Sequence, residues 1–287
     1  MKINIFSNKK INRSLGGNML LLLALTLFGL FMALPFIYAI LQSLKPTQEI
    51  FAFPPRFFVS NPTLDNFYML TQAIGDTWVP MGRYIVNSAL VTVTATAGNC
   101  LFAAMAAFPL AKLHFRGNRL VSEIVTYALL FTAPVTQFPK YVIMAKTGFI
   151  DSYWALFLPP IAMPLGLFLL KNFMSQLPDS VLEAAEMDGA SIYQTLWRVA
   201  IPNVKPALLT LIILTSQEVW NGAGASFIYS EPLKLLPTVL NQIAASGLAR
   251  AGVGSAVAVV IMIVPVSVFI LLQSKVIETM AFSGIKD

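Results

Sequence analysis

The sequence has little charge, one cysteine and one histidine, and each scarcity excludes a class of protein. Only 11% of its 287 residues are charged, whereas 57% are hydrophobic and the mean hydropathy is +0.73. Soluble domains are usually about a quarter charged, so these values indicate a polytopic membrane protein. Cys100 has no second cysteine with which to form an intramolecular disulfide. Because Cys100 and His114 both lie far from any acidic cluster, no metal site is expected.

Catalytic and nucleotide-binding motifs are also missing. No G-x-x-x-x-G-K-[ST] loop occurs, so any ATP and Mg²⁺ that drive this protein must bind to another subunit. We expect a non-catalytic chain that holds no cofactor. The net charge of +6 is spread between apolar segments instead of forming a patch, which argues for the lipid bilayer and against nucleic acid as a partner.

Six apolar segments predict an all-α protein with six transmembrane helices, at roughly 20 residues per crossing. They cover residues 19–41, 84–110, 120–138, 151–171, 206–221 and 253–273. The first run exceeds the apolar core of a signal peptide, so we expect it to be retained. Both the N-terminus, 1–18, and the tail, 274–287, are then cytoplasmic. More of the 19 Lys and Arg residues lie on the predicted cytoplasmic side than outside, as the positive-inside rule requires.

The loops divide the chain further. Spans one to four occupy residues 19–173, with an external loop at 42–83 that is rich in proline and aromatic residues. These aromatics suit a membrane–water interface, either as a cap that faces a substrate-delivery protein or as plain interfacial packing. Residues 174–205 form a polar cytoplasmic segment, and 206–273 hold the last two spans. A short helix is expected near 238–245.

Two places in the spans carry candidate pathway residues. Pro134 and Pro139 should interrupt the third span near Gln137, which predicts either a pathway-lining break or a simple kink. In the fifth span Glu218 lies about 18 Å from the cytoplasmic end. An intramembrane acid is expensive, so Glu218 could accept hydrogen bonds from sugar hydroxyls, with Trp220 stacking on a ring and Asn221 alongside. Glu218 could instead pair with a cation or reach the outer interface.

The polar segment between the fourth and fifth spans contains helix signals. Ser180 and Glu183 have capping-box spacing, and Gly189 indicates a helix end or hinge. Ser191 can cap a second helix, from about 192 to 199, that should end before Pro202. We therefore predict two short helices joined at Gly189 outside the bilayer. A polar loop with some helix is the alternative.

The same segment carries a motif at fixed spacing. Glu183-Ala184-Ala185 is followed after three residues by Gly189, and after nine more by Val199-Ala200-Ile201-Pro202. This resembles the EAA loop, E-A-A-x3-G-x9-I-x-L-P, of type I ABC-importer permeases, with Val199 and Ile201 as conservative departures. The run that begins with Asp188 and Gly189 resembles the sugar branch typified by the smaller maltose permease subunit. The resemblance implies that this loop docks into a groove on an ATPase subunit, with coupling residues Glu183, Ala184, Ala185, Asp188, Gly189 and Pro202.

The resemblance also implies an assembly and a substrate class. The chain would pair with a homologous second permease subunit, two ATPase subunits and an extracellular or periplasmic sugar-binding protein, in a bacterial cell membrane. The family often has Trp-Asn-Asp-Phe where this chain has Trp220-Asn221-Gly222-Ala223. The tail, from Gln273-Ser274-Lys275 to Glu278-Thr279-Met280 with Gly284-Ile285-Lys286, resembles that of importers of plant cell-wall oligosaccharides such as pectin fragments. Alternatives are an importer of another solute, an ion-driven secondary transporter or channel, and a membrane enzyme, although no catalytic cluster lies near one leaflet.

Overall fold

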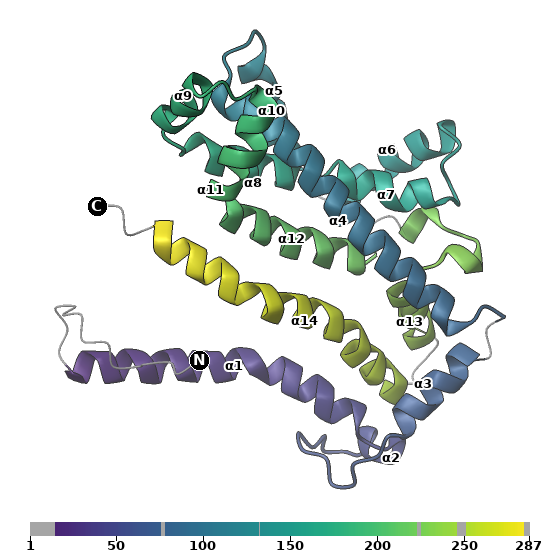
Figure 1. Ribbon diagram of the computed structural model, residues 1–287. Coiled ribbons are helices and arrows are strands. Elements are labelled where there is room, and N and C mark those ends of the chain that lie inside the picture. The colour runs from purple at the N-terminus through teal and green to yellow at the C-terminus, as the bar shows by residue number, and fades with distance from the viewer. Residues whose placement is uncertain (1–14, 76–77, 132, 223–224, 246–250, 284–287) are drawn as a thin grey trace.

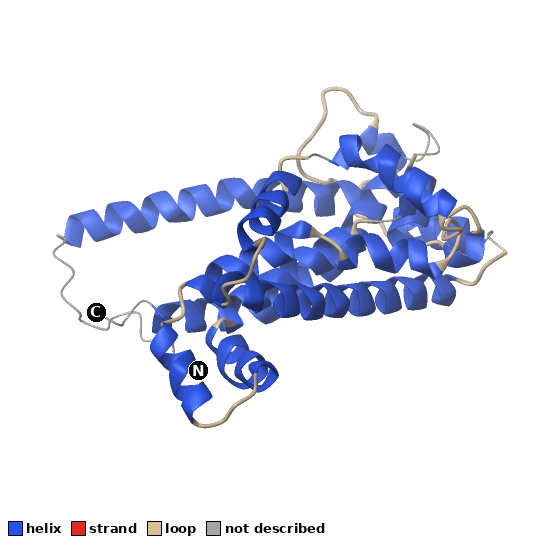
Figure 2. Cartoon of the chain, turned by 90° about the horizontal axis from the view of Figure 1, so that it is seen from above, coloured by secondary structure: helices blue, strands red, loops and turns tan. Residues whose placement is uncertain are grey.

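The computed structural model describes residues 15–75, 78–131, 133–222, 225–245 and 251–283, and throughout this part of the chain every regular element is a helix (Figure 2). The long helices are α1 (Leu15–Ser43), α4 (Met81–Lys112) and α14 (Ala251–Ser283). Helices of intermediate length are α3 (Asp65–Gly75), α5 (Asn118–Ala128), α6 (Ala133–Lys146), α7 (Tyr153–Ile161), α8 (Pro164–Ser175), α9 (Asp179–Met187), α12 (Lys205–Trp220) and α13 (Leu236–Ala244). Short elements are α2 (Thr47–Ile50), α10 (Ile192–Thr195), the π-helix η1 (Leu196–Ala200), α11 (Ile201–Asn203), and the 3₁₀ turns η2 (Ala225–Phe227) and η3 (Glu231–Leu233).

Four of the described helical segments are long and apolar enough to cross a membrane. They are Gly16–Ser43, Met81–Lys112, Tyr153–Ser175 and Ala251–Lys275. The helical stretch Ile192–Asn203 meets the stretch that begins at Lys205 at an 82° bend. If these two stretches count as one span, the number of candidate spans in the described chain rises to five. The helix expected near 238–245 is present as α13.

The third predicted span is divided differently from the prediction. Its residues form α5 and α6, and the described chain leaves the helix at 129–131, before the prolines rather than at them. Pro134 lies in the first turn of α6, where backbone N–H groups have no hydrogen-bond partner within the helix. Its missing N–H therefore costs no helical hydrogen bond, and Pro134 lies at the start of a helix instead of ending one. In Figure 1, α5 lies at the same end of the molecule as α9, and α6 lies at the end of α7.

Helix α4 is the centre of the bundle and packs against α7, α8 and α12. Its alanines allow these close contacts, because Ala95, Ala103, Ala104 and Ala107 are all buried. A Cβ on Gly98 would stand 2.8 Å from the Ile161 side chain, so this approach needs glycine.

A buried amide joins the same helices. The Asn99 Nδ2 donates to the carbonyls of Pro160 and Ile161, each at 3.0 Å, at the break between α7 and α8. Thr215 on α12 donates to Asn99 Oδ1 at 3.2 Å. Asn99 is only 1% exposed, so it satisfies polar groups that would otherwise be stranded in an apolar interior.

Helix α14 packs against α12, α13 and α3, and also against α1. The N-terminal half of α1 nevertheless stands away from the other helices (Figure 1, Figure 2). Its side chains are exposed on all sides, with Leu20 at 72% and Phe28 at 62%. The apolar surface of this N-terminal half of α1 therefore has no cover within the described chain.

Candidate functional site

The segment between α8 and α12 begins with α9, which starts at Asp179 behind Pro178. The predicted capping box of Ser180 and Glu183 is wrong, because Ser180 lies inside the helix and no side chain caps its start. Pro178 supplies the start instead: its fixed φ and extended ψ turn the chain into the first helical residue. Glu183 therefore lies in the second turn of α9.

Gly189 ends α9, as predicted. Its φ is +80°, in the left-handed region, and its N–H donates to the Glu186 carbonyl at 2.9 Å. The Ala190 N–H donates to the Ala185 carbonyl at 3.0 Å, which completes a Schellman motif. A Cβ at Gly189 would meet nothing within 4 Å, so the requirement for glycine comes from backbone conformation and not from crowding.

The second helix starts where predicted and ends later than predicted. The Ser191 hydroxyl accepts from the Gln194 N–H, and the Gln194 side chain accepts from the Ser191 N–H. The helical path then continues through η1 and α11 to Asn203 and includes Pro202, so the prediction that it ends before Pro202 is wrong. Pro202 is accommodated because it occupies the first turn of a new α-helical segment after the wider π-turn.

One side of this segment is anchored to the bundle. Leu196, Ala200 and Val204 are buried against α4, α8 and α12. The Lys112 ammonium, at the end of α4, donates to Asp179 Oδ1 at 2.7 Å and to the Leu177 carbonyl. This hydrogen bond to Lys112 holds the pKa of the Asp179 carboxyl below its ordinary value. This contact joins the start of α9 to the end of α4.

The other side of the segment is exposed, and it carries most of the predicted coupling residues. Glu183, Ala184, Asp188, Gly189 and Pro202 are exposed, and Ala185 is half-buried. Sequence reasoning missed the apolar side chains beside them, although bulky apolar residues in a polar loop are a readable signal. These are Met187 at 89%, Tyr193 at 67%, Ile192 at 58% and Trp197 at 43% exposed. We name this set of acids and apolar side chains the coupling face; its composition suits contact with another protein.

The four candidate pathway residues do not form one site. Trp220 is 7% exposed, packs in the core of α3, α13 and α14, and donates its indole N–H to the Ile261 carbonyl at 2.9 Å. Its ring is therefore part of the helix packing. Glu218, on α12, and Asn221, directly after the end of α12, are both exposed. Gln137 is exposed on a different helix, α6, and within the described residues no hydrogen bond joins it to the other three.

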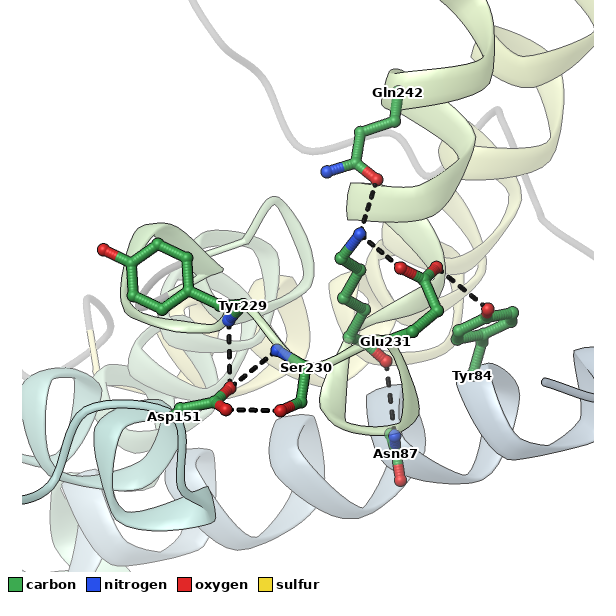
Figure 3. A network of polar contacts seen from close by, with 8 residues as sticks. Tyr84, Asn87, Asp151, Tyr229, Ser230, Glu231 and Gln242 are labelled. Atoms are coloured by element: carbon green, nitrogen blue, oxygen red, sulfur yellow. Dashed lines mark hydrogen bonds and ion pairs between the residues drawn. The ribbon is translucent and has the colours of Figure 1, made fainter. Parts of the chain in front are cut away.

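A polar network at the opposite end from α9 was not predicted (Figure 3). Asp151, in a left-handed conformation with φ of 57°, accepts the N–H of Tyr229 at 2.9 Å and of Ser230 at 2.8 Å. It also accepts the Ser230 hydroxyl, and this bond holds the Asp151 pKa below its ordinary value. The start of α7 is thus tied to the segment that joins η2 and η3.

The same segment is tied to α4. Tyr84 donates its hydroxyl to Glu231 at 3.0 Å, and the Asn87 amide donates to the Lys234 carbonyl at 3.2 Å (Figure 3). The same amide donates to the Pro232 carbonyl at 2.8 Å. Lys234 pairs with Glu231 and donates to Gln242 on α13. We name these residues, with Asp151 and Ser230, the outer network. They hold the ends of α4, α7 and α13 together.

This arrangement of helices is shared with a chain of a solved ABC transporter. The described fold superimposes on a bacterial ABC transporter involved in the import of the acidic polysaccharide alginate, with a TM-score of 0.69, 21% identity, and coverage of 91% of this chain and 98% of that one. At that identity the likeness concerns the fold. Residues 99–279 also match the family described as binding-protein-dependent transport system inner membrane component, and the chain belongs to that family.

Two relatives come from Bacillus subtilis (strain 168). The protein LplC is 32% identical over 206 residues, which cover 70% of this chain and 66% of LplC. The polygalacturonan/rhamnogalacturonan transport system permease protein YtcP is 27% identical over 209 residues, which cover 71% of this chain and 69% of YtcP. The chain thus matches about two thirds of each relative's length. It is accordingly a membrane component of a binding-protein-dependent transport system.

Proposed function

We propose that this chain is the membrane-spanning permease subunit of an ATP-driven importer of oligosaccharides, and that it couples ATP hydrolysis in a separate subunit to alternating access. The observation that carries the proposal is the coupling face. Its exposed acids and apolar side chains belong to a segment whose other side is buried against α4, α8 and α12. A rigidly mounted contact surface of this kind can transmit a force from a partner into the bundle.

The proposal includes a six-span topology with both termini in the cytoplasm. The third span would consist of α5 and α6, and the fifth of α12. Lys112, Arg116 and Arg119 support this orientation, because they cluster at the same end as α9, and positive charge favours the cytoplasmic side. The outer network would then face the extracellular or periplasmic side, where a binding protein delivers the substrate.

The mechanism involves no covalent chemistry in this chain. ATP and Mg²⁺ would be bound by two ATPase subunits, and closure of that pair would bring two coupling faces together, one from this chain and one from a homologous second permease subunit. The acids Glu183 and Asp188 would meet basic residues in the ATPase groove, and Met187 and Tyr193 would fill its apolar part. The Schellman turn at Gly189 would keep the two helices at a fixed angle while the load is applied.

The exposed helix α1 supports a permease partner. Its N-terminal half has no contact surface in the described chain that could cover it, and no side chain between residues 19 and 31 is buried. In an assembly, lipid and the second subunit would cover it. Packing between helices of two subunits in lipid relies on close van der Waals contact, which a long regular helix can provide.

The substrate is proposed to be an oligosaccharide derived from a plant cell-wall polysaccharide. The names of YtcP and of the alginate transporter support a polysaccharide-derived sugar. For the pathway we retain Glu218, Asn221 and Gln137, whose side chains are exposed and could accept or donate hydrogen bonds to hydroxyls. Trp220 is left out because its ring is buried within the subunit.

A single-cysteine cross-link tests the coupling assignment. Cys100 is replaced by serine, and Ala184→Cys on the coupling face is treated with a short bifunctional reagent in membranes that contain the co-expressed ATPase subunit. We expect a cross-linked permease–ATPase product. Lys140→Cys, exposed on α6 at the other end of the bundle, is the matched control and should give none. Equal cross-linking from both positions, or none from Ala184→Cys in an intact complex, contradicts the proposal.

A further inference from the structure

A basic groove lies where α4 turns into α5. It has a volume of about 790 Å³, and the side chains that line it include His114, Phe115, Arg116, Arg119, Ser122 and Lys171. The lining comes from the turn 113–117, the first turns of α5 and the end of α8. Four of these six side chains are histidine, arginine or lysine, and this composition favours the binding of an anion.

The turn that forms one wall is held in a single shape. Asn118 donates its side-chain amide to the Leu113 carbonyl at 2.9 Å and to the Leu110 carbonyl at 3.3 Å, which closes the end of α4. Ser122 donates to Asn118 Oδ1 at 3.2 Å. Gly117, with φ of +95°, allows the chain to reverse before α5. The groove is therefore built before any ligand arrives.

Two of its cations are not neutralised. Lys112 forms an ion pair with Asp179, and Arg119 forms an ion pair with Glu123 at 2.9 Å. By contrast, in the described part of the chain neither Arg116 nor Lys171 has a hydrogen-bond or ion-pair partner. Lys171 is also partly buried, near the end of a candidate membrane span. A lysine ammonium in this position can be stabilised by an anionic headgroup at the membrane surface.

Apolar side chains continue from the groove along α5. Leu120 is 62% exposed, Ile124 57% and Tyr127 59%, and their spacing of four and three residues places them on one face of the helix. A ligand with an anionic head beside Arg116 and Lys171 and an apolar tail along this face would satisfy both surfaces. A free anion would use only the first.

We propose that this groove binds the headgroup of an anionic phospholipid of the cytoplasmic leaflet, with its acyl chains along the exposed face of α5. Basic pockets between membrane helices on the cytoplasmic side are suited to such headgroups. The inference rests on the orientation given under the proposed function, and it does not depend on the substrate or on ATP coupling.

Native mass spectrometry of the purified full-length chain, with the subunits that accompany it, tests the site. The protein is equilibrated in micelles with equal amounts of phosphatidylglycerol and phosphatidylcholine. We expect retained phosphatidylglycerol. Because each surface cation strengthens binding of anionic lipid about fivefold, the double variant Arg116→Gln/Lys171→Gln should lower its apparent affinity about 30-fold. Lys205→Gln, which removes an exposed cation at the same end outside the groove, should leave it unchanged.

The other outcomes separate the alternatives. Inorganic phosphate at millimolar concentration should not displace the lipid; displacement would mean that the groove is a site for free phosphate and would overturn the proposal. Equal retention of both lipids, or unchanged retention in the folded double variant, would overturn it too. If the double variant keeps its lipid but loses the ATPase subunit, the groove contacts protein. Lipid retention in a chain that fails to cross-link to an ATPase would leave this site standing while the proposed function fails.

Discussion

Lys112, the last residue of α4, and Asp179, the first residue of α9, form an ion pair with 2.7 Å between Nζ and Oδ1. The Lys112 side chain is nearly buried, at 8% exposure, whereas the Asp179 side chain is 75% exposed. The pair connects the start of α9 to α4, the helix that contacts α7, α8 and α12.

The variant Asp179→Asn should weaken coupling without preventing insertion. The amide keeps an acceptor oxygen but loses the charge, so α9 is held less firmly. Because the carboxylate is exposed and screened, we expect a moderate effect, about a two- to fivefold fall in ATPase stimulation by the loaded binding protein. Stimulation is measured in reconstituted vesicles. Glu123→Gln, which removes the carboxylate of another surface pair, is the control. Unchanged stimulation in Asp179→Asn would show that this contact carries no load.

Substitutions at Gly189 should rank by backbone conformation and not by size. A left-handed φ costs an ordinary residue about 1–2 kcal/mol, least for asparagine and most for a β-branched residue. Since a Cβ meets nothing within 4 Å, bulk alone is tolerated. We therefore expect Gly189→Asn to be close to wild type, Gly189→Ala intermediate, and Gly189→Val uncoupled although inserted.

The measurements for Gly189 are ATPase stimulation and substrate uptake in vesicles, with membrane insertion checked by protease protection. If Gly189→Val transports and stimulates normally, the coupling assignment of this segment is wrong. If Asn and Val are equally damaging, the glycine is required for contact with the partner and not for its φ.

Glu218 and Trp220, two residues apart on α12, should give opposite phenotypes. Glu218 is exposed, so Glu218→Gln should change uptake more than assembly. Trp220 is buried and donates to the Ile261 carbonyl, so Trp220→Phe should lower stability by about 1 kcal/mol and reduce the yield of assembled complex. Uptake per assembled complex and thermal unfolding of the purified complex separate the two effects. Loss of assembly in Glu218→Gln would favour a structural pair with another subunit.

The Asp151 contact should depend on pH in the acidic range only. Its hydrogen bonds from Ser230 and Tyr229 lower the folded-state pKa below the unfolded value of about 3.9, so the carboxylate stabilises the folded state above that value. This contribution is lost as the pH falls through the lowered folded-state pKa. Amide exchange of Tyr229 and Ser230 should therefore be slow from neutral pH down to about 4, after correction for intrinsic rates, and faster below.

Asp151→Asn isolates the charge, because asparagine tolerates the left-handed φ of 57° at this position. We expect faster exchange of the same two amides at neutral pH, with exchange in α8 unchanged. Protection that is the same in Asp151→Asn and in wild type would mean that the outer network is held by Glu231, Tyr84 and Asn87 without Asp151.

Several features were readable from the chain because they depend only on neighbouring residues. The apolar runs predicted the long helices, Gly189 predicted the end of α9, and Ser191 predicted the start of α10, since a left-handed turn or a cap is decided within about four residues. Local signals also misled. Ser180 has the spacing of a cap but lies inside α9, because Pro178 starts the helix first, and Pro202 continues a helix that a proline was expected to end.

What tertiary structure alone decided is which side chains meet. In the sequence Trp220 follows Glu218 by two positions. Only the packing of α12 on α14 buries Trp220 and leaves Glu218 exposed. Asn99 caps carbonyls about 60 positions away, and Lys112 reaches Asp179 across 67. Burial and pairing over such distances follow from the way helices pack, and no pattern confined to one helix contains that information.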